Sequence, residues 1–263
     1  SDAKKEMKSD GHFQLPVKKT EPIVYHAEEL SPAEKLMSNI RDAKGLKAQL
    51  AAAGELYKGI GDVENKDAVL DEVVAILNSA IKNHLRIKPS LALEAVLLRD
   101  AIRTGSGVQS QEEELVANDI FEKADNLAGV IEGLSAVKQK LALEAFREVH
   151  PDTWVDTYLK LINETGFRLV GEMVQILIDT GHFDKFKGNL TKLISKRKAS
   201  TDLMLWIGKN RSDSFADILG PDVFHAMMAA IENDRFEDRK TSKLGDLILS
   251  DQELITDLIG TAD

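Results

Sequence analysis

The sequence predicts an all-α protein whose helices form an irregular, antiparallel, solenoid-like stack of the HEAT or TPR kind, with about ten to eleven helices and no sheet. Three observations lead to this prediction. Apolar residues recur at helical spacing along most of the chain after residue 30, no stretch alternates strictly between apolar and polar residues, and helix-capping residues stand between the periodic stretches. A compact helical bundle, or two of them, is the alternative architecture.

The composition excludes several classes of protein. With 263 residues, 43% of them hydrophobic, the chain can bury roughly three quarters of its unfolded surface, so it is not disordered as a whole. It contains no cysteine, which excludes disulfide frameworks, thiolate nucleophiles and cysteine-ligated metals and makes the cytoplasm the expected compartment. No apolar run approaches the roughly 18–20 residues of a membrane span. The net charge of −10 argues against a surface that binds nucleic acid everywhere.

Residues 1–30 are predicted to be a flexible tail. Lysines and acidic residues interleave there, and Pro16 and Pro22 interrupt any helical period. Order is expected to begin at Ser31, because Pro32 occupies the first helical position and Glu34 lies three residues after the serine, which together form a capping box.

The periodic stretches then give the predicted helices in order. The first stretch begins at residue 32 and ends between residues 54 and 61, as one helix or as two. The others cover residues 66–85, 91–103, 110–126, 127–149, 152–165, 168–180, 183–198, 201–209, 222–233 and 252–259. The break at residues 104–107, where two glycines flank a serine, divides the chain into an N-terminal helical subdomain, residues 31–104, and a C-terminal helical-repeat subdomain, residues 108–263. Gly166 and Gly181 follow threonines at helix ends and are expected to be left-handed C-caps.

One short phrase supports repetition within the chain. The pentapeptide Leu-Ala-Leu-Glu-Ala occurs at residues 91–95 and again at residues 141–145. Short turns between helices make sequential neighbours antiparallel, as in a repeat stack. The pentapeptide is common in amphipathic helices, so this single echo is weak support for the stack over the bundle.

The sequence offers no catalytic or metal site. None of the six histidines lies three or four residues from another, and the glycine motifs that bind phosphates or present a nucleophile are absent. Gly54, Gly59 and Gly61 are interpreted as turn glycines. The three glutamates at residues 112–114 are interpreted as the first turn of a helix, where they favour the helix dipole. We therefore expect a protein that is not an enzyme and that binds no cofactor and no metal.

One segment has a charge opposite to that of the chain. Residues 181–211 contain eight basic and two acidic residues, a balance of +6 within a chain at −10. The eight basic residues are the candidate partner-binding residues: Lys185, Lys187, Lys192, Lys196, Arg197, Lys198, Lys209 and Arg211. Such a cluster is either a solvated face that complements a helix dipole or a surface for an acidic protein or a phosphate backbone, in which case affinity falls steeply with salt.

Aromatic residues near this segment are interpreted as core. Trp154 and Trp206 sit among apolar residues at helical spacing, and Phe183 and Phe186 lie three residues apart on one helical face. Core packing is favoured over base stacking at these positions, which leaves single-stranded nucleic-acid binding through the basic stretch as a third hypothesis.

The last quarter of the chain resembles a known family. Three stretches carry the resemblance: LMLWIGKNR at residues 203–211, FHAMMAAIE at residues 224–232 and KLGDLILSDQELITDLI at residues 243–259. They are similar to the helical N-terminal region that precedes the Gre-type domain in long members of the GreA/GreB transcription elongation factor family.

The resemblance implies binding to bacterial RNA polymerase, whose backtracked complexes this family stimulates to cleave the transcript. The family cleaves with acidic tip residues of a coiled-coil hairpin and binds with a small globular domain. Neither part matches this chain, so no cleavage residue is carried over. The chain ends at Asp263, where the resemblance would lead into the Gre-type part, and we expect an N-terminal fragment.

The leading hypothesis is therefore a noncatalytic helical interaction region of a transcription elongation factor. It would dock on RNA polymerase or its regulators, with residues 192–198 as the surface to test. The alternative is a general helical-repeat adaptor, unrelated to transcription, that binds peptides.

Overall fold

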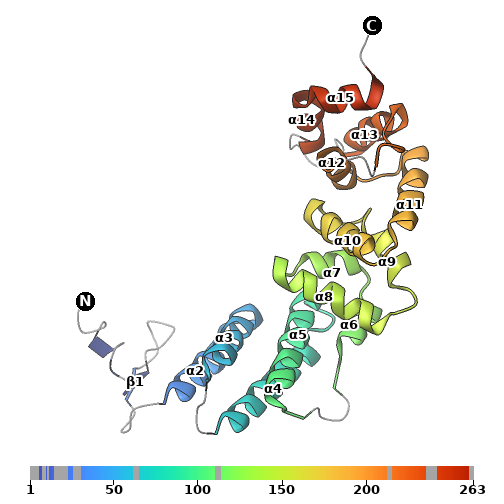
Figure 1. Cartoon of the computed structure of the whole chain (residues 1–263). Coiled ribbons are helices and arrows are strands. Elements are labelled where there is room, and N and C mark those ends of the chain that lie inside the picture. Colours follow the sequence, from blue (N-terminus) through green and yellow to red (C-terminus); the bar gives the residue numbers. More distant parts are fainter. Residues whose placement is uncertain are drawn as a thin grey trace. The chain divides into compact units, whose positions relative to one another are not determined.

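The computed structural model describes residues 6–7, 10, 12–14, 23–25, 31–61, 65–109, 114–211, 215–234 and 242–260 (Figure 1). These described residues form fourteen helices, so the predicted all-α helical stack is confirmed. The number exceeds the expected ten to eleven for three reasons. Residues 31–61 form two helices, residues 127–149 break at Gly133, and residues 243–250 form a further helix.

The described part of the N-terminal tail contains one short strand pairing. β1 (Phe13–Gln14) pairs antiparallel with β2 (Val24–Tyr25). This ladder of two residues is too short to change the fold class. The predicted flexibility of residues 1–30 concerns mainly positions, among them Pro16 and Pro22, that lie outside the described residues.

The chain divides into two compact units, Ser1–Ala124 and Asp125–Asp263. The division predicted from the sequence lies at residues 104–107 instead. In the structure α5 (Pro89–Ser106) continues through that stretch, and Gly107, with a φ of 74°, ends the helix in the left-handed conformation. The next helix, α6 (Ala117–Lys123), packs on α5 and so belongs to the first unit.

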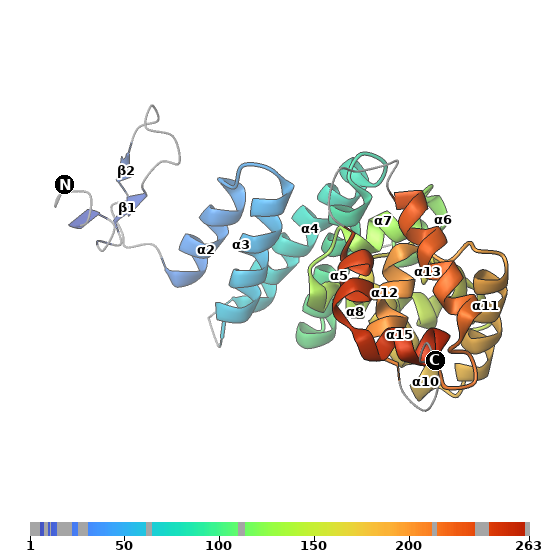
Figure 2. The same cartoon turned by 90° about the horizontal axis from the view of Figure 1, so that it is seen from above.

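The first unit is built from helix pairs. Its described residues form α2 (Pro32–Arg41), α3 (Leu46–Gly59), α4 (Lys66–His84), α5 and α6. α2 packs on α3 and α4 packs on α5, and Figure 2 shows α2, α3 and α4 side by side. The core consists of fully buried aliphatic side chains, among them Ile40, Leu56, Leu70, Leu77 and Leu93. The predicted capping box is confirmed, because the Glu34 amide donates to Ser31 Oγ (3.2 Å) and the Ser31 amide donates to Glu34 Oε2 (2.8 Å).

A buried polar cluster in the first unit corrects the interpretation of the glutamate run. Glu114 lies before α6, which begins at Ala117, so it does not stand in the first turn of a helix. Its carboxylate accepts hydrogen bonds from Arg103 and from Asn78 Nδ2, the latter at 2.5 Å. Glu112 and Glu113 lie outside the described residues.

The second unit contains nine helices within its described residues. They are α7 (Leu127–Glu132), α8 (Ala136–Val149), α9 (Trp154–Leu161), α10 (Phe167–Asp179), α11 (Phe183–Ser195), α12 (Thr201–Lys209), α13 (Pro221–Asp234), α14 (Lys243–Ser250) and α15 (Gln252–Ile259). α10 is central, since it contacts α8, α9, α11 and α12, and α12 in turn contacts α13 and α14. The side chains of Met173, Val174, Leu190 and Leu203 are completely buried.

The glycine predictions had mixed outcomes. Gly181 has a φ of 74° after α10 and is the left-handed C-cap that was expected. Gly166 is not, because its backbone is extended and it forms the N-cap of α10, with its N–H bonded to the Glu132 carboxylate. Gly54 lies inside α3, so its interpretation as a turn glycine was wrong, whereas Gly61 has a φ of 50° just after that helix.

Candidate interaction surface

The basic stretch lies on α11, on the turn that follows α11 and at the end of α12, all within the second unit. Three of its eight residues are engaged inside the unit. Lys187 Nζ bonds to Asp217 Oδ1 at 2.7 Å, and the Lys209 ammonium lies 5.5 Å from the centre of the Phe167 ring, within the range of a cation–π contact.

Arg211 is the most heavily bonded residue of the stretch. Its guanidinium bonds to both carboxylate oxygens of Asp251, at 2.8 and 3.0 Å, and its Nε donates to Asp257 at 2.9 Å. It also donates to the carbonyl of Gly208. These bonds raise the pKa of Arg211 and hold the pKa of the Asp251 carboxyl below its ordinary value. Arg211 therefore joins α12 to the start of α15 and has little capacity left for a partner.

The other five basic residues are exposed, and none forms an ion pair with any residue that the structure describes. Four of them, Lys192, Lys196, Arg197 and Lys198, gather at the C-terminal end of α11 and are called here the basic end. The fifth, Lys185, lies two turns before Lys192 on the same helix. At the C-terminal end the helix dipole is negative, so these cations stabilise α11 as well as giving the surface its charge.

The backbone of the basic end forms a Schellman motif. The Arg197 N–H bonds to the Ile194 carbonyl at 2.9 Å, and the Lys198 N–H bonds to the Leu193 carbonyl at 2.9 Å. Arg197 occupies the left-handed position with a φ of 53°, which glycine usually takes. The helix therefore ends abruptly, and the chain turns at the point where its charge is densest.

Asn163, from the turn after α9, binds the segment that follows the basic end. Its Nδ2 donates to the Lys198 carbonyl at 3.0 Å, and its Oδ1 accepts from the Ser200 N–H at 2.7 Å. Ala199, between these two residues, is buried. The Asn163 side chain thus connects the basic end to the turn after α9.

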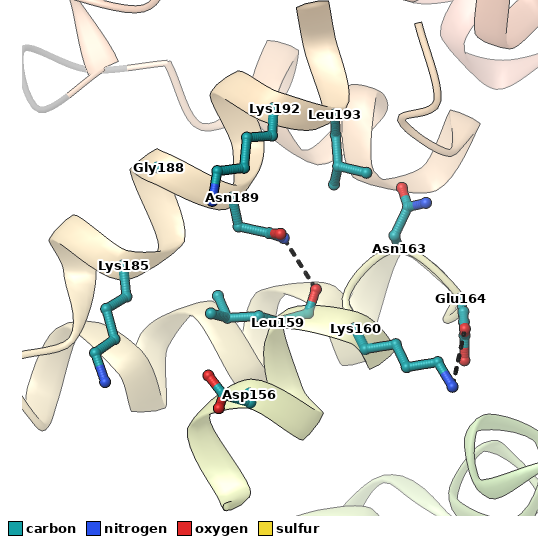
Figure 3. Close-up of a pocket in the computed structure, with 10 residues that line it drawn as sticks. All are labelled: Asp156, Leu159, Lys160, Asn163, Glu164, Lys185, Gly188, Asn189, Lys192 and Leu193. Carbon is teal, nitrogen blue, oxygen red and sulfur yellow. Dashed lines mark hydrogen bonds and ion pairs between the residues drawn. The ribbon is translucent and has the colours of Figure 1, made fainter. Parts of the chain in front are cut away.

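An open groove of about 630 Å³ adjoins the basic end between α9 and α11 (Figure 3). The groove is crossed by a hydrogen bond from Asn189 Nδ2 to the Leu159 carbonyl at 3.0 Å. Its lining residues are Asp156, Leu159, Lys160, Asn163 and Glu164 from α9 and its following turn, and Lys185, Gly188, Asn189, Lys192 and Leu193 from α11. No sequence pattern had marked this groove, although two of the candidate lysines lie on its wall.

The aromatic residues near the basic stretch form part of the core. The Phe186 ring lies 6.4 Å from Trp206 and 6.3 Å from Phe215, and Phe186 is 1% exposed. Trp206 lies against Gly171, where a Cβ would come within 2.9 Å of the indole Nε1. The core interpretation is confirmed for Phe186 and Trp154, both of which are buried, and Trp206 is half-buried in the same packing. Phe186 therefore offers no exposed ring face on which a base could stack.

The described part of the chain contains neither a metal-binding cluster nor a helix that could span a membrane. There, no group of three or more histidine, aspartate or glutamate side chains is arranged to hold a metal ion. None of the described helices is both long enough and apolar enough to cross a membrane.

Fold and surface together define an all-α helical stack with a basic helix end and an adjoining groove. The chain belongs to the family of GreA-associated C-terminal domains, whose family model matches residues 32–253. This match confirms the resemblance to a helical region associated with Gre-type elongation factors and extends it from the last quarter of the chain to both units. No curated protein and no solved structure matches the chain.

Proposed function

We propose that this chain is a noncatalytic, cytoplasmic protein-interaction domain that works with a GreA-type transcription elongation factor. In this proposal the basic end of α11 docks on an acidic surface of bacterial RNA polymerase or of one of its regulators. Membership of the GreA-associated family supports the link to transcription.

The observation behind the proposal is the contrast within the basic stretch. Lys187, Lys209 and Arg211 are engaged by side chains of their own unit. The basic end is exposed and forms no ion pair with any described residue. Unpaired cations gathered in a chain with a net charge of −10 create a local field that attracts an acidic surface and speeds the encounter with it.

The proposal is tested by capture of bacterial core RNA polymerase on the immobilised chain. The test variant reverses three charges, Lys196→Glu, Arg197→Glu and Lys198→Glu. The matched control variant reverses three exposed lysines of α3 and α4, Lys47→Glu, Lys58→Glu and Lys82→Glu. We expect the test variant to bind at least about tenfold more weakly and the control to bind within about twofold of the parent chain, with the loss growing as salt is lowered.

Two results would overturn the proposal. One is the absence of polymerase binding by the parent chain at about 10 μM. A complex that does not form at this concentration has a binding free energy weaker than about −7 kcal/mol. The other is equal binding by the test variant and the parent while circular dichroism shows both folded. A labelled single-stranded RNA is measured in parallel. The nucleic-acid hypothesis would be favoured if the parent chain bound the RNA and not the polymerase, and if the test variant lost that RNA binding.

A further inference from the structure

We infer that the groove between α9 and α11 binds an acidic helix of a protein partner. Two carboxylates of that helix pair with Lys185 and Lys192, and an apolar side chain lies over Gly188 between Leu159 and Leu193. The inference rests on the proposed function only in taking the partner to be a protein.

One wall of the groove is a face of α11, and the other is formed by α9 and the turn that follows it. The lining positions on α11 follow the spacing i, i+3, i+4, i+7 and i+8, which places them on a single stripe of that helix. On the other wall, the first three positions follow the same spacing on α9 and the last two lie in the turn. Both helices pack on α10, and the space between them holds no other described element. Two helices with a groove between them form a surface on which a third helix can pack. The volume, about 630 Å³, accommodates several side chains of one segment and not a folded domain.

Gly188 lacks a structural reason within this unit. It lies inside α11, where glycine is less favourable than any residue except proline. Its φ is not positive, and a Cβ built on it would meet no atom within 4 Å. Gly171 differs, because a Cβ there would strike Trp206. A glycine that is unfavourable for the helix and unneeded by the core leaves room in the groove wall for the close approach of another chain.

The charges of the groove select an acidic occupant. Lys160 and Glu164 pair with each other at 3.9 Å and largely offset one another. Lys185 and Lys192 remain without an ion pair to any described residue. Apart from the Lys160–Glu164 pair, the charged residue that lines the opposite wall is Asp156. They lie seven residues apart, a rise of about 10.5 Å along α11. Carboxylates seven residues apart on a partner helix have the same spacing.

The polar groups of the groove favour a helix over an extended peptide. The main-chain groups of α9 and α11 bond within their own helices and offer no ladder to an added strand. Asn163 uses both ends of its amide inside the unit, and Asn189 donates to Leu159. An extended peptide would leave its own N–H and C=O groups without partners here, whereas a helix satisfies them internally.

The inference is tested with the whole chain and a synthetic peptide. The peptide is an alanine-rich, labelled helix with two glutamates seven residues apart and two leucines between them on the same face. Binding is measured by fluorescence anisotropy at low salt. We expect saturable binding below about 1 mM that weakens at least about tenfold in a Lys185→Glu, Lys192→Glu variant. A second peptide with lysines in place of the glutamates is expected to prefer that variant over the parent chain.

Gly188→Leu gives the sharper test, because its two effects have opposite signs. Leucine favours the helix, so the unfolding temperature should rise by a few degrees, while its side chain fills the groove and peptide binding should fall at least about tenfold. Gly54→Leu in α3 is the matched control. Gly54 is also a helical glycine whose Cβ would meet nothing within 4 Å, and it belongs to the first unit, whereas every residue that lines the groove belongs to the second, so only stability should change.

The outcomes separate this inference from the proposed function. No peptide binding by the parent chain, or equal binding by Gly188→Leu and the parent, overturns the groove assignment even when polymerase is still captured. Peptide binding that both groove variants lose supports the assignment even if polymerase is not captured, a result that would overturn only the proposed function.

Discussion

Replacing Glu114 by glutamine should destabilise the first unit by about 3 kcal/mol. The Glu114 side chain is 8% exposed, and its partners Arg103 and Arg99 are 12% and 1% exposed. Breaking a buried ion pair costs about 3–5 kcal/mol because the remaining charge is left uncompensated. The lower value applies here, since the glutamine oxygen can still accept from Asn78 and since Asp100 still pairs with Arg99 at 2.8 Å.

The assay must report on the first unit alone. Both tryptophans, Trp154 and Trp206, lie in the second unit, so their fluorescence follows only that unit. Hydrogen exchange of the α4 and α5 amides, followed by mass spectrometry, reports on the first. A loss of about 3 kcal/mol should speed exchange of the slowest of these amides about a hundredfold. The tryptophan unfolding transition serves as the internal reference.

Glu72→Gln is the control for this prediction. Glu72 pairs with Arg41 at 2.5 Å in the same unit, but the two side chains are 44% and 59% exposed. Exposed pairs contribute about 0–1 kcal/mol, so exchange should change by less than about fivefold. If Glu114→Gln and Glu72→Gln had the same effect, the reasoning from burial would be refuted.

Three further predictions concern the second unit. Arg197→Gly should stabilise it by about 1 kcal/mol, because the left-handed backbone of Arg197 is strained for a residue with a Cβ; a lower unfolding temperature would contradict this. Tyr158→Phe should destabilise it by about 1 kcal/mol in urea unfolding followed by tryptophan fluorescence, because the buried hydroxyl donates to the Leu143 carbonyl at 2.6 Å; an unchanged midpoint would count against that bond. Arg211→Met should reduce the dependence of stability on pH. The Arg211 hydrogen bond lowers the pKa of the Asp251 carboxyl, so its contribution is present at neutral pH and is lost as pH falls through the lowered pKa. The difference in Tm between about pH 7 and about pH 3 should therefore shrink in the variant, and an equal difference would argue against this role.

Local features of the fold could be predicted, because they depend on residues close in sequence. The capping box at Ser31 and the C-cap at Gly181 each involve residues within one or two helical turns. Gly166 could not be predicted in this way. Its amide bonds to Glu132, which is 34 residues away, and that contact belongs to the packed unit and not to the local pattern.

The candidate surface was predictable as a set of charges but not residue by residue. Counting charges identified the basic stretch, yet Lys187 and Arg211 are bonded to Asp217 and Asp251, which lie 30 and 40 residues further along the chain. The groove is lined by residues of the segments 156–164 and 185–193, so the pattern of one continuous sequence segment could not predict it. A glycine in the middle of a predicted helix, Gly188, is the sequence feature that could have pointed to it.

The two hydrogen bonds of Asn163 affect the conformational entropy of the chain next to the basic end. The side-chain amide of Asn163 bonds to the Lys198 carbonyl and to the Ser200 N–H, the backbone groups on either side of the buried Ala199. These two bonds restrict the conformations of the segment after α11 in the free chain. The conformational entropy of ordering it is lost during folding and not during binding. In the proposed docking, a substitution at Asn163 would weaken binding by loosening the free chain and not by removing a contact to the partner.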